Sequence, residues 1–158
     1  MTTNSTNSTD SVNPEQPTPH RIVTAPDLAP PVGFAHAVVA APGHTVHLGG
    51  QTAQGPDGTI LGTTVVEQFD QAARNVVTAL AAAGATPVHL VSLLIYVTDV
   101  AAYKAALPEL GPLWREHFGR HYPAVALFGI TELFDTEAMI ELLATAVVPE
   151  GSTDEALR

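Results

Sequence analysis

The sequence lacks cysteine, has few cations and contains no long apolar run. Without cysteine, the chain has no disulfide, no thiolate metal site and no thiol nucleophile. Six Lys and Arg against sixteen Asp and Glu give a net charge of -10, so it lacks the cationic surface that binds phosphate backbones. We therefore expect no nucleic-acid partner. Because no apolar run reaches the roughly 18 residues of a membrane span and no signal peptide opens the sequence, we also expect a cytoplasmic protein without a membrane partner.

Charged residues are scarce as well, at 14% of the chain, whereas apolar residues reach 46%. Much of the surface must then be uncharged or covered, and a second copy of the chain is the simplest cover. The length of 158 residues suits one domain. We expect residues 1–19 to form a disordered tail, residues 20–149 to form the domain and residues 150–158 to be flexible.

Apolar periodicity predicts six strands and two helices. A helix over 66–83 is the best defined, because apolar residues recur every three or four positions before Gly84. A second helical stretch over 100–118 should be split or kinked by Pro108 and Pro112. The strands are expected at 20–24, 34–41, 45–48, 88–97, 123–130 and 139–148, with the second and third forming a β-hairpin. This order predicts an α+β fold, in which one mixed sheet of about six strands carries both helices on one face.

Four short strings of residues, at the right intervals, resemble the RidA/YjgF family of reactive imine deaminases over about residues 22–148. The strings are Gly49-Gly50-Gln51, Glu67-Gln68 through Asn75 to Gly84, Val97-Thr98-Asp99, and Pro123-Ala124 followed by residues 139–146. The resemblance implies a chorismate-mutase-like fold and a homotrimer with small-molecule pockets between subunits. It also implies hydrolysis of a reactive imine or enamine to a keto acid and ammonia, without a cofactor.

The family's anchor for a substrate carboxylate is missing from this chain. The resemblance places an Arg directly after Pro123-Ala124, where this sequence has Val125, and valine cannot bind a carboxylate. The chain also has Gly49, Phe34, Ala35 and Gly111 where the family has Ser, Tyr, Ser and Asn. We therefore expect a more apolar pocket, and a substrate that differs from the usual amino-acid-derived imines.

Glu141 matches the family's carboxylate and is the candidate catalytic residue, which would position or deprotonate water. A carboxylate on a strand of Met, Ile, Leu and Ala must be hydrogen-bonded or tuned for function. The alternative is that Glu141 faces solvent or makes one structural hydrogen bond at the trimer interface. The candidate substrate-binding residues are Gly50, Val125, Gly49, Phe34, Ala124, Arg120 and Trp114. For Gly50, close approach to a ligand and a structural bulge are both open.

Arg120 is a candidate because it lies between His117 and His121, just before the position of the missing Arg, and would replace that cation from a new direction. His36 is a weaker candidate for proton transfer, and a structural hydrogen bond is the favoured interpretation. No pair of histidines has metal-ligand spacing, so we expect no metal.

The aromatic residues Trp114, Tyr122 and Phe128 are candidates to line a pocket near Val125. Aromatic residues with this spacing more often pack in a core or an interface, and that interpretation stays open.

Two functions fit these features. The first is a cofactor-free hydrolase of a reactive imine or enamine. The second is a non-catalytic trimer that binds or senses a small metabolite, because function resides in the site and not in the fold. An endoribonuclease role is disfavoured by the acidic charge balance.

Overall fold

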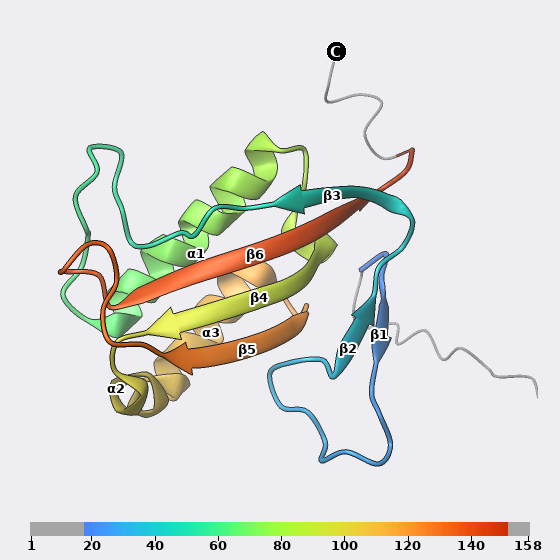
Figure 1. Ribbon diagram of the computed structural model, residues 1–158, viewed down its shortest axis with the longest axis horizontal. Helices are drawn as coiled ribbons and strands as arrows, with labels where there is room; N and C mark the ends of the chain where they lie inside the picture. The colour runs from blue at the N-terminus through green and yellow to red at the C-terminus, as the bar shows by residue number, and fades with distance from the viewer. Residues whose placement is uncertain (1–17, 152–158) are drawn as a thin grey trace, which may run out of the picture.

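The computed structural model describes residues 18–151. The main sheet has four strands, in the order β3 (Gly43–His47), β6 (Ile140–Pro149), β4 (Leu90–Val97) and β5 (Ala124–Gly129) (Figure 1). Strands β4 and β5 are parallel and the other neighbours are antiparallel, so the sheet is mixed as expected. The predicted tail and flexible C-terminus fall mostly on residues 1–17 and 152–158, outside the described residues.

Helix α1 (Val65–Ala82) begins at a capping box and covers nearly the same residues as the helix predicted over 66–83. The Thr64 hydroxyl accepts from the Glu67 N–H at 3.2 Å, and the Glu67 carboxylate accepts from the Thr64 N–H at 3.1 Å. The apolar stripe of the helix is fully buried against the sheet, and Gly84 ends the turn after it with a φ of +71°. The short helix η1 (Pro87–His89) then leads into β4.

The second helical stretch is divided, as predicted, into α2 (Val100–Ala105) and α3 (Leu107–Phe118). Asp99 caps α2 by accepting from the Ala102 N–H at 2.9 Å. The division falls at Pro108, which sits in the first turn of α3, where a missing N–H costs little. Pro112 lies inside α3 without interrupting it.

The predicted hairpin between residues 34–41 and 45–48 is wrong. Strand β2 (Ala37–Val39) pairs with β1 (Arg21–Val23), and β3 pairs with β6. The six strands therefore form two sheets, and the two-stranded ribbon of β1 and β2 stands apart from the main sheet (Figure 1). Between β2 and β3 the backbone groups bond to other parts of the chain and not to each other. The Ala41 N–H donates to the His20 ring, and the Pro42 carbonyl accepts from the Glu150 N–H.

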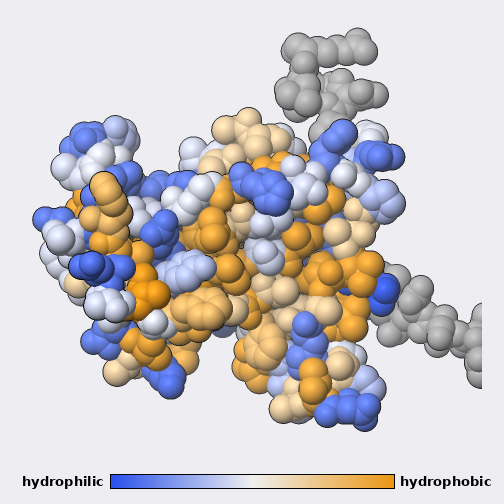
Figure 2. All heavy atoms as spheres, viewed as in Figure 1, coloured by the Kyte–Doolittle hydropathy of each residue, from blue (hydrophilic) through white to orange (hydrophobic). Residues whose placement is uncertain are grey.

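The two faces of the main sheet differ in burial. Alternate residues of β4 and β6 point to the helices and form the core, for example Leu93, Ile140 and Leu142, each at 0% exposure. The residues between them, such as Leu94 and Leu143, face away from the helices and are half-buried. Apolar residues gather across the middle of this second face, which we call the open face (Figure 2). None of the helices within residues 18–151 is long and apolar enough to span a membrane.

Candidate functional site

The predicted site residues separate into two groups on opposite sides of the main sheet. Phe34, Trp114 and Val125 line a wide cavity of about 1560 Å³, between β1 with the loop at 31–35 on one side and α3 with β5 on the other. Ala35 and Gly111 also line this cavity. Three parts of the chain that the resemblance associates with substrate binding, Phe34-Ala35, Gly111 and Val125, therefore meet around one space.

An aromatic wall forms part of this cavity. The rings of Trp114 and Tyr122 are stacked, with centroids 5.5 Å apart and planes 6° apart. Phe118 packs edge-on against Trp114 at 4.9 Å, and the Trp114 indole N–H donates to the His121 carbonyl at 3.1 Å. These contacts fix the indole ring at the cavity wall. Of the three aromatic residues expected near Val125, the structure places Trp114 and Tyr122 there.

Phe128 lies elsewhere, on the open face. It pairs with Tyr96 across β5 and β4, and the two rings stack with centroids 5.5 Å apart. Val125 and Phe128 are three residues apart on one strand, so their side chains point to opposite faces. Phe128 and Val125 therefore cannot line the same pocket within one chain.

The cavity contains no carboxylate among the described residues that line it, and Arg21 is the one lining residue with a permanent charge. Arg21 forms no ion pair within residues 18–151. His20, next to it, is buried and has both ring nitrogens engaged, with the His89 carbonyl at 3.0 Å and the Ala41 N–H at 3.2 Å. Arg120, the predicted replacement cation, is exposed and does not line the cavity.

Glu141 and the two glycines form the second group, on the open face. The Leu48 N–H donates to the Ala144 carbonyl and the Gln51 N–H to the Leu142 carbonyl, so Gly49 and Gly50 together oppose one residue of β6. This arrangement is a β-bulge. A Cβ atom at Gly50 would collide with the Glu141 carboxylate, whereas at Gly49 it would meet nothing within 4 Å. Gly50 therefore permits the approach of Glu141 to the backbone.

The surroundings of Glu141 are largely apolar. Its side chain is half-buried, its cross-strand neighbour on β4 is Tyr96, and Phe128 lies one strand further along the same face. Within residues 18–151 the Glu141 carboxylate makes no hydrogen bond or ion pair, which leaves both oxygens free for water or a ligand. Ala124, at the other end of β5, points to this open face as well, because its neighbour Ser92 does.

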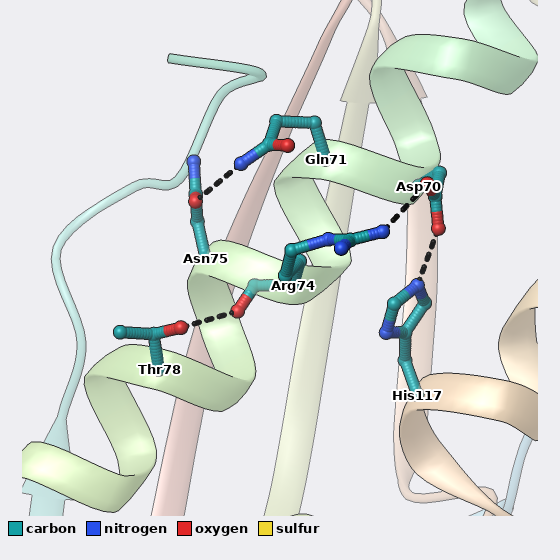
Figure 3. A network of polar contacts seen from close by, with 6 residues as sticks. All are labelled: Asp70, Gln71, Arg74, Asn75, Thr78 and His117. Carbon is teal, nitrogen blue, oxygen red and sulfur yellow. Dashed lines mark hydrogen bonds and ion pairs between the residues drawn. The ribbon is translucent and has the colours of Figure 1, made fainter. Parts of the chain in front are cut away.

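The helix residues that carry the resemblance hold this group in place. Gln68 is fully buried, donates to the Gly62 and Glu137 carbonyls, and accepts from the Met139 N–H at 2.7 Å. Asn75 donates to the carbonyls of Thr52 and Gln54 and accepts from Gln71 at 2.9 Å (Figure 3). Helix α1 thus fixes both the segment after the glycine bulge and the start of β6, which carries Glu141.

Three of the histidines make hydrogen bonds that hold the fold together. His36 bonds the backbone of the loop that precedes it, at Ala25 and Ala29, which confirms its structural interpretation. His117 joins α3 to α1 through Asp70 at 2.6 Å, and this hydrogen bond lowers the pKa of the Asp70 carboxyl (Figure 3). His121 is buried and bonds the Leu90 carbonyl at 2.7 Å, and burial lowers its pKa. No group of three His, Asp or Glu side chains within the described residues has the geometry of a metal site.

Two residues at these sites were not singled out from the sequence. Tyr96 lies beside Glu141 because of the register between β4 and β6, which the sequence does not state. Arg21 reaches the cavity because β1 pairs with β2 and not with the main sheet. The sequence held one signal for Arg21, because it is one of only six Lys and Arg residues and lies within the first predicted strand, 20–24.

The sequence matches the family described as endoribonuclease L-PSP over residues 24–148. The Rid-family protein YyfB from Yersinia pestis is 31% identical, with a TM-score of 0.74, over 82% of this chain and 98% of that one. Rv2704 from Mycobacterium tuberculosis, of the YjgF family, is 30% identical, with a TM-score of 0.55, over 74% and 88% of the two chains. RidA from an Antarctic Psychrobacter shares the fold at 21% identity and a TM-score of 0.58, over 80% and 98%. No curated protein shows significant similarity to the chain.

Proposed function

Because the chain belongs to the RidA/YjgF family, also described as endoribonuclease L-PSP, we propose that it hydrolyses a reactive imine or enamine with an apolar reactive end. The observation that carries this proposal is the clustering of Phe34, Gly111 and Val125 around one cavity. These are the positions where the resemblance expects substrate-binding side chains. The fold provides the pocket, and the apolar side chains that line it favour a substrate other than the usual amino-acid-derived imines.

The proposed site is shared between copies of the chain. The cavity and Glu141 lie on opposite sides of the sheet, so a substrate bound in the cavity cannot contact the Glu141 of the same copy. A homotrimer in which the cavity of one copy faces the Glu141 of the next would complete the site. The half-buried apolar open face supports this arrangement, since such a face is usually covered in the assembled protein (Figure 2).

Glu141 would act as a general base in this site. Its carboxylate accepts a proton from water while the water oxygen attacks the carbon of the C=N bond, and the π electrons of that bond move to nitrogen, which is protonated. The resulting carbinolamine passes its hydroxyl proton through the Glu141 carboxylate to the nitrogen as the C–N bond breaks, which releases ammonia and leaves a carbonyl. An enamine is first protonated at carbon and then follows the same path. No cofactor is required for these steps.

The lining of the cavity argues for the apolar substrate. Val125 offers no charge or hydrogen bond, Phe34 offers a ring without a hydroxyl, and Gly111 offers no side chain. A small imine with a carboxylate next to the C=N carbon would lose its expected anchor here. The acidic charge balance disfavours RNA as the substrate, despite the family's description.

The test compares two substrates and two variants. Freshly generated 2-aminoacrylate and a neutral aryl imine are offered to the wild type, to Glu141→Gln and to Glu116→Gln, an exposed carboxylate on α3 that serves as the control. We expect faster turnover of the neutral imine, and a loss of about 100-fold or more in Glu141→Gln alone. Unchanged turnover in Glu141→Gln would exclude Glu141 as the base. A stable monomer in light scattering would contradict the shared site.

The second candidate, a trimer that binds a metabolite without converting it, is favoured by one observation. The cavity has lost the polar groups that the family's chemistry uses at Phe34, Gly111 and Val125, while it keeps its aromatic wall. Tight binding of the neutral imine with no release of ammonia above background would establish this function in place of hydrolysis.

A further inference from the structure

We propose that Arg21 binds an anionic group at the distal end of an elongated apolar ligand in the cavity. The inference rests on the proposed function only in placing the substrate in this cavity. It adds a second recognition element, at the end away from the C=N carbon. The ligand class that follows is an aryl or alkyl chain that ends in a carboxylate.

The charged residues are distributed unevenly around the cavity. The chain has sixteen Asp and Glu residues, yet none within residues 18–151 lines this cavity. Arg21 is exposed, lines the cavity and has no ion-pair partner among the described residues. In a protein with a net charge of -10, an anion is repelled from most of the surface. The rim at Arg21 is a place where this repulsion is locally reversed.

The backbone of Arg21 is held firmly, which a recognition residue needs. Its neighbour His20 is buried and bonded through both ring nitrogens to residues before β4 and after β2. Thr18 donates to the Val88 carbonyl at 2.7 Å, and Arg21 itself pairs with Val39 across the ribbon. The base of the side chain is therefore fixed on both sides, and only the guanidinium has to be ordered by a ligand.

The remaining walls define the body of the ligand. Trp114 and Tyr122 present stacked rings, and Leu127, Val125 and Phe34 add apolar surface. In a single copy the cavity is open on one side and has a volume of about 1560 Å³, so it has room for a ligand much longer than a three-carbon imine. A ring or chain that spans from the aromatic wall to the rim would bury apolar area and bring its end group to Arg21.

The chain contains a built-in probe of this site, because Trp114 is its single tryptophan. The experiment follows Trp114 fluorescence on titration with 4-phenylbutyrate and with 4-phenylbutan-1-ol, which has the same body without the charge. Propionate tests the charge without the body. For the wild type we expect the acid to bind about tenfold more tightly than the alcohol, and propionate to bind weakly.

Arg21→Gln should weaken binding of the acid about tenfold and leave binding of the alcohol unchanged. Arg21→Lys should restore most of that loss. Arg120→Gln is the matched control, because it removes the same charge from a position outside the cavity. Equal binding of acid and alcohol by the wild type, no binding of either, or an equal loss in Arg120→Gln and Arg21→Gln would overturn the proposal.

The assay separates this inference from the proposed hydrolysis. If binding of the acid depends on Arg21 but no imine is turned over, the proposed hydrolysis is excluded and the anion site is supported. If turnover depends on Glu141 but binding of the acid does not depend on Arg21, the proposed hydrolysis is supported and the anion site is excluded. Circular dichroism of each variant verifies that the fold is intact.

Discussion

The cavity and the open face differ in what they offer a ligand, although one sheet separates them. The cavity has aromatic walls, a large volume and one cation at its rim, but no carboxylate within the described residues. The open face has a carboxylate beside a tyrosine on a flatter, half-buried surface. The proposed binding residues and the proposed general base are therefore held by different parts of the fold. If both proposals hold, substitutions in the cavity can change substrate preference without disturbing Glu141.

The strongest test of this comparison uses two adjacent leucines of β6 that point to opposite faces. Leu142 is fully buried under the helices, and Leu143 lies half-buried on the open face. We expect Leu142→Ala to lower the free energy of unfolding by about 2–5 kcal/mol, because it leaves a cavity in the core. Leu143→Ala should cost less in stability and should reduce the assembled mass measured by light scattering.

Equal destabilisation by the two leucine substitutions, with no change in mass, would show that the open face is not an interface. Urea unfolding at several protein concentrations separates the two effects, since only an assembled protein has a concentration-dependent midpoint.

The glycine bulge offers a smaller, sharper test. Gly50→Ala should greatly reduce hydrolysis at little cost in stability, because its methyl group would displace the flexible Glu141 carboxylate. Gly49→Ala is the matched control, since its methyl group would meet no atom within 4 Å. If Gly50→Ala kept full turnover, the closeness of Gly50 and Glu141 would have no role in catalysis. Binding of 4-phenylbutan-1-ol at the cavity should be unchanged in both variants.

The smallest expected effect is a pH dependence of the free energy of unfolding, caused by two histidines on the helix side of the main sheet. Burial lowers the pKa of both His121 and His89, so the folded chain resists protonation that the unfolded chain accepts near pH 6.5. The stability that these groups contribute is fully present above that pH and falls as the pH drops below it. The slope is at most about 1.4 kcal/mol per pH unit for the buried His121, and solvent makes the contribution of the more exposed His89 smaller. Urea unfolding followed by Trp114 fluorescence should show this slope between pH 7 and 5.

His121→Gln should flatten the pH slope, whereas His44→Gln, an exposed histidine on β3, should not. A slope in His121→Gln as steep as in the wild type would assign the effect to other groups.

The sequence was informative where local chemistry decides the structure. The apolar spacing of residues 66–83 and the two prolines after Asp99 were enough to predict α1 and the division between α2 and α3. The pairing of β2 was missed because it depends on His20, which takes the Ala41 N–H from 21 residues away. A turn signal such as Pro42-Gly43 carries no information about such a distant acceptor.

The candidate site was predicted in part for the same reason. The residues around the cavity came from a resemblance, and the structure groups Phe34, Trp114 and Val125. The side of the sheet on which each one lies follows from strand register, which residue types alone do not determine. Phe128 could therefore not be separated from Val125 by sequence alone, and its stacking on Tyr96 fits the packing interpretation. Arg21 was overlooked because its position at the cavity depends on the pairing of β1 with β2.

Strand β5 forms one edge of the main sheet, and its sequence Ala-Val-Ala-Leu-Phe-Gly contains no charged residue and no proline. Natural edge strands usually carry such residues, which discourage another chain from adding a strand. An isolated copy would expose this edge together with its apolar neighbours. If the chain assembles as we propose, copies that fail to assemble should aggregate by strand addition, and dilution or interface variants should reduce solubility before they yield a folded monomer.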